Sequence, residues 1–342
     1  MPGAAFAWRC AEYSTLHRAE TRAQPLEPAG ANGSLTMPRV SLAMPVFNGE
    51  NFIESAIASI LAQDFADFEL IITDNASSDR TEAICRKFAE SDARVRYHRN
   101  PKNLGAAPNY NLGFELASGE YLKWCAHDDL ISENYLSECV KILDENPDVA
   151  LVFGRTQCID DAGAPIPLVG HQLPALTGLT PARRFGKVIR FSGTCFEIFG
   201  LFRLATLKRT SLHRLYYGSD RALLAETALL GDYALAEKAT FYNREHGTRS
   251  INIDDKRARR QWQFADARKG AAFEHLSLLN HLFEIARRHA DAAPVAASVA
   301  EVATFALKPM QMGRYLLEAI GAVSPGAQQW LRRRALGLSK AA

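Results

Sequence analysis

The chain has 342 residues, enough for one large domain or two smaller ones. Hydrophobic residues make up 47% and charged residues 23%, which is typical of a globular protein. The formal net charge is only +2. This balance gives no electrostatic reason to expect nucleic-acid binding.

The six cysteines form no Cys-x-x-Cys pair and no zinc-ribbon spacing. Scattered cysteines in apolar surroundings are usually buried thiols, which indicates a reducing, cytoplasmic compartment. No apolar run reaches the roughly 18 uncharged residues of a membrane-spanning helix. The nearest candidate, 302–323, is interrupted by Lys308, Pro309 and Arg314. A signal peptide's apolar centre is also missing from the N-terminus.

Three parts are expected along the chain. Residues 1–36 are a poorly patterned leader rich in Ala, Pro and Gly, expected to be disordered or to precede the true start at Met37. Residues 37–250 are expected to form the main domain, with halves at 37–160 and 161–250. Residues 251–342 are predicted to be a helical extension, because several segments there have helical spacing and basic faces.

Between residues 39 and 160 the pattern alternates apolar runs with amphipathic segments. Helices of about 12 residues between consecutive strands predict a parallel sheet covered by helices on both faces. The expected strands are 40–46, 68–74, 95–100, 121–126 and 149–159, and the expected helices are 50–63, 79–90, 107–118 and 132–146.

Polar, turn-forming clusters follow four of these strands. In parallel sheets, ligands bind at the carboxyl ends of the strands, so the clusters predict one binding cleft. They are Pro45–Asn48, Asp74–Ser77, Asn100–Gly105 and His127–Asp129.

Several chemistries are disfavoured at this cleft. The first strand is followed by "PVFNGENF" rather than Gly-x-Gly-x-x-Gly, and neither a Walker loop nor a Gly-x-Ser-x-Gly elbow is found. Carboxylates and amides remain. An Asp pair is a hard-oxygen site suited to Mg²⁺ or Mn²⁺, which would screen the phosphates of a bound nucleotide diphosphate.

Two segments, "SLAMPVFNGENFIESAIASILAQDFADFELIITDNASSDRT" and "NPKNLGAAPNYNLGFELASGEYLKWCAHDDL", resemble the nucleotide-binding half of the family-2 inverting glycosyltransferases. The resemblance is dense over 38–165 and looser over 190–250. It implies the α/β GT-A fold, with a mixed, mainly parallel sheet. It also implies divalent-metal-dependent transfer of a sugar (a hexose) from a nucleotide-sugar, expected to be a UDP-sugar, to a hydroxyl of a glycan or lipid-linked acceptor, in surface polysaccharide or glycoconjugate biosynthesis.

The resemblance assigns nucleotide-sugar contacts to the first three clusters. The family's Asp-Asp-Gly-Ser turn corresponds to residues 74–77, where Asn75 and Ala76 replace the second Asp and the Gly. An Asn offers both donor and acceptor groups, so this position does not by itself specify which base is bound. Expected contacts are Pro45, Phe47 and Asn48 beside the nucleoside, Asp74 and Asn75 at the base, and Asn103 and Gly105 near the ribose.

The family's Asp-x-Asp motif falls on residues 126–128, and its first Asp is replaced by Ala126. The resemblance makes Asp128 a metal ligand and His246 a second metal or phosphate contact. His127 is a candidate to bind the ribose in place of the missing Asp. Asp129 is a candidate nucleotide-sugar contact, with an N-cap of the helix near residue 132 as the alternative. For His246 the alternative is a purely structural histidine.

Asp220 corresponds to the family's general base, which removes the proton of the acceptor hydroxyl. Alternatively, Ser219 or Asp220 caps the helix expected over 220–230. Glu226 is the next candidate for the base.

Two other functions remain open: a catalytically weak nucleotide-sugar-binding protein, and an interaction subunit of a polysaccharide assembly complex. The basic helices after residue 255 are usually solvated faces. The alternative is peripheral attachment to an anionic membrane surface, where lipid-linked acceptors reside.

Overall fold

The computed structural model describes residues 37–216, 218–247, 249, 252, 256–266 and 273–324. The expected leader over 1–36 and the basic segment at 330–340 lie outside these residues. Within them, the α/β class and the mixed sheet are confirmed.

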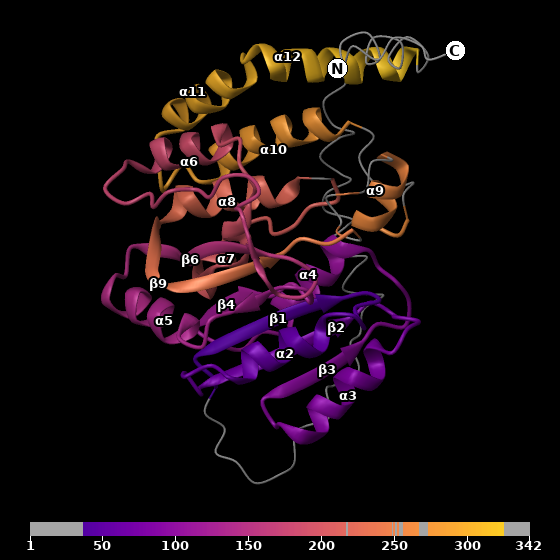
Figure 1. Ribbon diagram of the computed structural model, residues 1–342. Coiled ribbons are helices and arrows are strands. Elements are labelled where there is room, and N and C mark those ends of the chain that lie inside the picture. The colour runs from indigo at the N-terminus through magenta and orange to yellow at the C-terminus, as the bar shows by residue number, and fades with distance from the viewer. Residues whose placement is uncertain are drawn as a thin grey trace. The chain divides into compact units, whose positions relative to one another are not determined.

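The first half of the sheet is parallel. Its strands are β1 (Val40–Val46), β2 (Phe68–Asp74), β3 (Val95–Arg99) and β4 (Tyr121–Trp124), in the order β3-β2-β1-β4 (Figure 1). In register, Val46 lies beside Asp74 and Asp74 beside Arg99. The polar clusters after these strands therefore meet at one edge, as expected from the sequence.

The second half is reached through a short reversed strand. β8 (Leu201–Arg203) lies antiparallel between β4 and β6 (Val149–Ile159), so β6 runs in the same direction as β4. β9 (Asp232–Arg244) is parallel to β6, and its end therefore lies at the same edge as the end of β4. The short strands β5 (Leu130–Ile131) and β7 (Pro165–Ile166) pair antiparallel with β9 and β6.

The sheet has a hydrophobic core on each face. Along β1 the side chains alternate, so Leu42 and Met44 join one core while Ala43 joins the other. The first core is covered by α2 (Ile53–Leu61), α3 (Thr81–Ser91) and α5 (Tyr135–Glu145).

The opposite face carries α4 (Ala106–Glu115), α6 (Pro181–Arg190) and α8 (Ser219–Leu230). Leu282 of α10 (Glu274–Arg288) and Val302 of α11 (Val295–Ala306) belong to the same core. A domain boundary near residue 250 stays a prediction. The remaining elements are η1 (Phe196–Phe199), α7 (Leu204–Leu207), α9 (Lys256–Gln263) and α12 (Pro309–Val323).

The expected helices are found, but most are shorter than predicted, and the alternative that Ser219 or Asp220 caps α8 is wrong. At the start of α3, the Asp79 carboxylate accepts the N–H of Thr81. α8 begins at Ser219 after Gly218, which adopts a left-handed φ of 85°, so neither Ser219 nor Asp220 is its N-cap. β9 begins at Asp232, directly after the end of α8 at Leu230.

Lys123 of β4 is buried in the first core. Its ammonium donates to the carbonyl of Phe199 and lies 4.7 Å from the ring centroid of Tyr135 and 5.3 Å from that of Phe241. Burial lowers the pKa of Lys123 below that of an exposed lysine. A buried charge with one carbonyl acceptor is expected to cost stability.

We therefore expect Lys123→Met to raise the free energy of unfolding by about 1 to 3 kcal/mol at pH 7. Because the folded-state pKa is depressed, the unfolded chain binds more protons below about pH 10. The difference in free energy of unfolding between Lys123→Met and the unaltered protein should therefore shrink as the pH rises from 7 towards 10. Urea unfolding at several pH values measures this, with the exposed Lys87→Met as control. If this difference in free energy of unfolding does not change with pH, the buried charge of Lys123 is not its cause.

Candidate functional site

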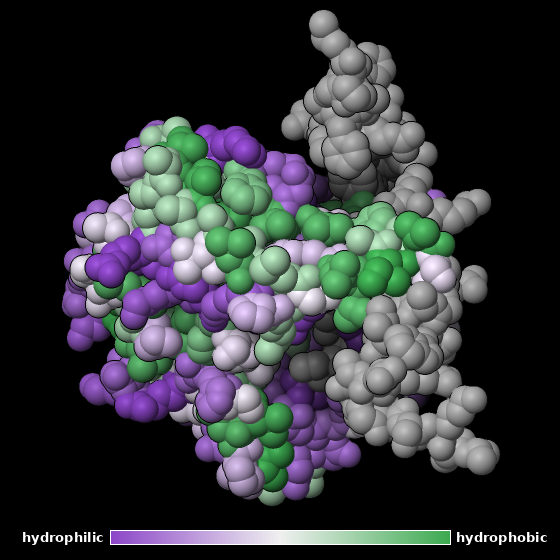
Figure 2. All heavy atoms as spheres, turned by 90° about the horizontal axis from the view of Figure 1, so that it is seen from above, coloured by the Kyte–Doolittle hydropathy of each residue, from purple (hydrophilic) through white to green (hydrophobic). Residues whose placement is uncertain are grey.

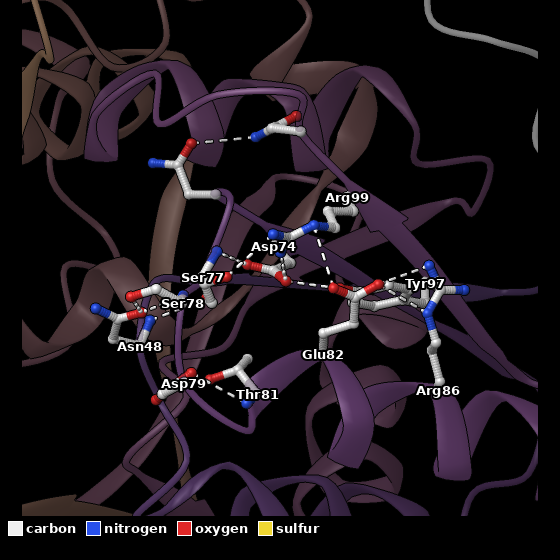
Figure 3. Close-up of polar contacts among 12 residues, drawn as sticks. Asn48, Asp74, Ser77, Ser78, Asp79, Thr81, Glu82, Arg86, Tyr97 and Arg99 are labelled. Atoms are coloured by element: carbon white, nitrogen blue, oxygen red, sulfur yellow. Dashed lines mark hydrogen bonds and ion pairs between the residues drawn. The ribbon is translucent and has the colours of Figure 1, made fainter.

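The turns after β1 and β2 are bonded to each other (Figure 3). Asn48, at a left-handed φ of 51°, accepts the N–H of Ser78 through its side-chain oxygen at 2.8 Å, and its own N–H donates to the Ser77 hydroxyl at 2.9 Å. Asparagine tolerates this conformation better than most residues. Phe47 is exposed beside the turn and Pro45 is buried in β1. The first two predicted clusters thus lie side by side at the carboxyl edge of the sheet.

Asp74 is fully buried at the end of β2 (Figure 3). Its carboxylate accepts hydrogen bonds from the Ser77 N–H at 2.8 Å, the Tyr97 hydroxyl at 2.6 Å and the Arg99 guanidinium at 2.9 Å. Ala76, where the family has glycine, adopts a φ of 61°. Asp74 therefore holds the turn in shape, and its direct contact with a base stays a prediction.

Asn75 connects the second cluster to the third. Its amide nitrogen donates to the side-chain oxygen of Asn103 at 2.9 Å and to the carbonyl of Gly105 at 3.1 Å. Its oxygen accepts from the Leu104 N–H at 2.8 Å and the Asn100 amide at 3.2 Å. Both donor and both acceptor positions of this amide are thereby used inside the protein.

Gly105 has a left-handed φ of 90°, and a Cβ there would lie 2.4 Å from the Cα of Phe264. The segment following α9 therefore packs directly on the Asn103–Gly105 loop, and the N–H of Ala265 donates to the carbonyl of Leu104 at 3.3 Å. Only glycine satisfies both constraints at this position.

The fourth cluster, His127–Asp129, joins the end of β4 to the end of β9. Asp128 and His246 lie 2.8 Å apart, carboxylate oxygen to Nε2. The ring of His127 packs against the first turn, since a Cβ on Gly49 would lie 2.6 Å from its Cδ2. Burial alone would raise the pKa of Asp128, but the neighbouring His127 and the His246 hydrogen bond hold that pKa below its usual range. The structure thus brings the two expected metal contacts, Asp128 and His246, together, and their binding of a metal stays a prediction.

Asp129 is buried and does not cap a helix, so that alternative is wrong; α5 begins only at Tyr135. Its carboxylate accepts the N–H of Arg244 at 2.8 Å and the amide of Asn243 at 3.2 Å, both on β9. Burial and the charge of Asp128 raise the pKa of Asp129 to about 8.

Arg244 completes this junction and was missed by the sequence reasoning. Its guanidinium donates to the carbonyl of Asp128 at 2.9 Å and stacks 4.9 Å from the ring centroid of Phe52. The basic residues around His246 in "NREHGTRS" were the available signal.

Asp220 lies in the first turn of α8, where burial raises its pKa. Tyr110 of α4 was not predicted from the sequence. Besides burial, its pKa responds both to Asp220 and to the carboxylates of the fourth cluster. Burial is the main cause of the raised pKa of Tyr110, and the charges of Asp128, Asp129 and Asp220 add to it. Tyr110 is therefore within electrostatic range of the carboxylates that follow β4 and of Asp220 in α8.

Glu226 is unsuited to act as the base. It is fully buried, and its carboxylate accepts from the N–H and hydroxyl of Ser211, from Arg288 of α10 and from His289 directly after that helix. Although burial favours the neutral form, these partners hold the pKa of Glu226 at about 2. It joins α8 to α10.

The side chains at this site supply only some of the ligands that a divalent cation needs. Asp128 and His246 offer one carboxylate and one imidazole, ligands that Mn²⁺ accepts. Among the described residues no group of three or more His, Cys, Asp or Glu side chains is arranged to hold a metal ion. The remaining positions around a cation would have to come from the donor diphosphate and water, as is usual for Mg²⁺ at substrate phosphates.

The sequence was compared with known proteins. Residues 41–205 match Glycosyl transferase family 2. An uncharacterized glycosyltransferase of Haemophilus influenzae is 30% identical over 195 residues, covering 53% of this chain and 77% of the relative. The GalNAc(5)-diNAcBac-PP-undecaprenol beta-1,3-glucosyltransferase of Campylobacter jejuni is 29% identical over 188 residues, covering 55% of this chain and 59% of its own length, which is less than two thirds.

Among solved structures, S. aureus TarS 1–349 in complex with UDP-GlcNAc superimposes with a TM-score of 0.61, covering 83% of this chain and 80% of that one. At 17% identity this likeness supports the fold alone. The sheet topology and this likeness define a GT-A-type protein. With the match to the Haemophilus relative, the chain belongs to glycosyltransferase family 2.

Restoring the family's second Asp is expected to harm this chain. In Asn75→Asp, a carboxylate would face the oxygens of Asn103 and Gly105 and lose both donated hydrogen bonds. We expect the free energy of unfolding to fall by about 2 to 4 kcal/mol at pH 7, measured by urea titration. The control is the exposed Asn48→Asp, which keeps its acceptor oxygen and should change stability by less than about 0.5 kcal/mol. Equal stability of the two variants would contradict the role assigned to Asn75.

Proposed function

We propose that the protein is an inverting glycosyltransferase that uses a nucleotide-sugar, a UDP-sugar in the first instance, and a divalent cation. The observation that carries the proposal is the 2.8 Å approach of Asp128 to His246 at the carboxyl edge of the sheet. These two side chains follow strands that are far apart in sequence, and the shared direction of β4 and β9 accounts for their meeting.

On the donor side, the turns after β1 and β2 and the Asn103–Gly105 loop form the wall beside the nucleotide. Asp74 and Asn75 shape this wall through their internal hydrogen bonds. His127 packs against Gly49 and directly precedes Asp128 in the chain, which supports a contact between its ring and the ribose. Asp128 and His246 would hold Mg²⁺ or Mn²⁺, which when bound supplies positive charge to the diphosphate leaving group.

On the acceptor side, Asp220 serves as the general base. It takes the proton of the acceptor hydroxyl as the oxygen bonds to the anomeric carbon. The bond from that carbon to the phosphate oxygen breaks, and its electron pair leaves with the nucleotide diphosphate. Burial raises the pKa of Asp220, which makes its carboxylate a stronger base than an exposed aspartate.

For the acceptor, we propose a hydroxyl of a glycan or lipid-linked glycan in surface polysaccharide or glycoconjugate biosynthesis. The support is the Campylobacter relative, whose name describes a glycan on undecaprenol diphosphate. The proposed site of action is the cytoplasm or the cytoplasmic face of a membrane.

One observation favours a second candidate, a nucleotide-sugar-binding protein with weak catalysis. Ala126 offers no carboxylate where the family's Asp-x-Asp motif begins. If His127 does not replace that contact, donor binding loses part of its ribose recognition and turnover falls with it.

Asp128→Asn tests the metal site. A neutral amide is a weaker ligand for a hard cation, so we expect the affinity for UDP in Mn²⁺ to fall at least about tenfold, while metal-free binding stays unchanged. Isothermal titration with and without Mn²⁺ measures both. Asp67→Asn removes an exposed carboxylate in the turn before β2 and is the matched control. If no nucleotide binds to the unaltered protein, neither the enzyme nor the binding-protein function holds.

Asp220→Asn separates catalysis from binding. The amide cannot accept the proton, so transfer should fall by about 10² to 10⁴ while the Kd for UDP stays within about twofold. Product formation from a panel of nucleotide-sugars, together with titration of UDP, gives both values. Glu226→Gln on the same helix is the control: it should lower the melting temperature but spare the Kd. Full turnover by Asp220→Asn would place the base elsewhere.

A further inference from the structure

The most buried side chains of helix α12 are polar. Its most buried residues are Gln311 and Glu318, with exposed fractions of 9% and 5%. The Glu318 carboxylate accepts the N–H of His275 at 3.0 Å and of Leu276 at 3.1 Å, at the start of α10. A carboxylate at a helix N-terminus also interacts favourably with the helix dipole. Polar contacts therefore hold α12 in place, the reverse of an ordinary amphipathic helix.

The opposite side of α12 is apolar and faces solvent. Met312, Leu316 and Val323 are 54%, 61% and 88% exposed, and their spacing of four and seven residues puts them on one side of the helix. Leu307 and Met310, at the junction with α11, are each 68% exposed. Figure 2, which looks down on α11 and α12, shows hydrophobic side chains along this surface. Contiguous exposed apolar surface of this kind usually marks an interaction site.

The exposed charged side chains on the segment that carries this apolar surface are all positive. From residue 294 to 324 the exposed side chains include Lys308 and Arg314 and no acidic residue. The two acidic residues of this stretch are bonded inward, Glu301 to Arg190 and Glu318 to α10. In sequence, residues 325–342 continue with four basic and no acidic residues. Anionic partners are therefore favoured.

We propose that the exposed apolar surface of α12 (Met312, Leu316 and Val323) and of its junction with α11 (Leu307 and Met310) docks on an anionic bilayer surface. An apolar stripe flanked by Lys and Arg is the pattern of helices that lie in the membrane interface. No helix among the described residues is long and apolar enough to cross a membrane, which fits a helix lying on the surface. A second copy of the chain fits less well, because a two-fold interface would bring Lys308 and Arg314 of both copies together.

The test is co-sedimentation of the full chain with vesicles, without donor or acceptor, so that its result does not depend on the proposed transfer. Vesicles of phosphatidylcholine alone are compared with vesicles containing about 30% phosphatidylglycerol. We expect binding to the anionic vesicles and little to the neutral ones, and a decrease in salt of about 0.5 M. Leu316→Glu should lower the partition coefficient about tenfold or more.

Leu168→Glu is the matched control, since it puts the same charge on an exposed leucine of another surface. It should bind vesicles as the unaltered chain does. Failure of the unaltered chain to prefer anionic vesicles, or unchanged binding of Leu316→Glu, would overturn the proposal. So would a dimer, seen by sedimentation velocity, that Leu316→Glu dissociates. A melting temperature lowered by several degrees in Leu316→Glu would show that the chain itself covers this face, and would likewise overturn it.

Discussion

The candidate site depends on how the ends of β4 and β9 are joined. Asp129 is buried between them, and its carboxylate accepts the backbone N–H of Arg244, while the Arg244 side chain returns to the carbonyl of Asp128. This reciprocal pair fixes the position of β9 relative to β4. A buried carboxylate is stable only when its acceptor positions are filled, so the junction tolerates little displacement. Because it is fixed, His246 reaches Asp128.

The sequence allowed the edge of the sheet to be predicted, but not every contact made there. Strand ends followed by turn residues are visible as patterns, and the family register supplied the pairing of Asp128 with His246. The reversal through β8 was not visible, because three residues carry no periodicity. The roles of Asp129 and Glu226 were also hidden. Whether a carboxylate binds a ligand or a neighbouring strand depends on which elements pack against it, and those elements are distant in sequence.

The chain departs from the family pattern at residues 75, 76 and 126, and local contacts account for the first two departures. Asn75 supplies two donors to the Asn103–Gly105 loop, which an aspartate would not. Ala76 takes the left-handed conformation that the family's glycine suits, at a cost of about 1 to 2 kcal/mol for an L-residue, and the bonds of Asp74 and Asn48 to the same turn offset this cost. For Ala126, no described contact accounts for the loss of the carboxylate.

The buried cluster around Glu226 has a mechanical consequence. Glu226 joins α8 to the C-terminal end of α10 through Arg288 and His289, and Glu318 of α12 accepts hydrogen bonds at the other end of α10. Asp220 lies at the beginning of α8. If α12 rests on lipid and Asp220 is the base, the buried contacts of α10 connect the membrane-bound helix to the helix that carries the base. The distance between the bilayer and the reacting hydroxyl would then be set by the fold rather than by a flexible linker.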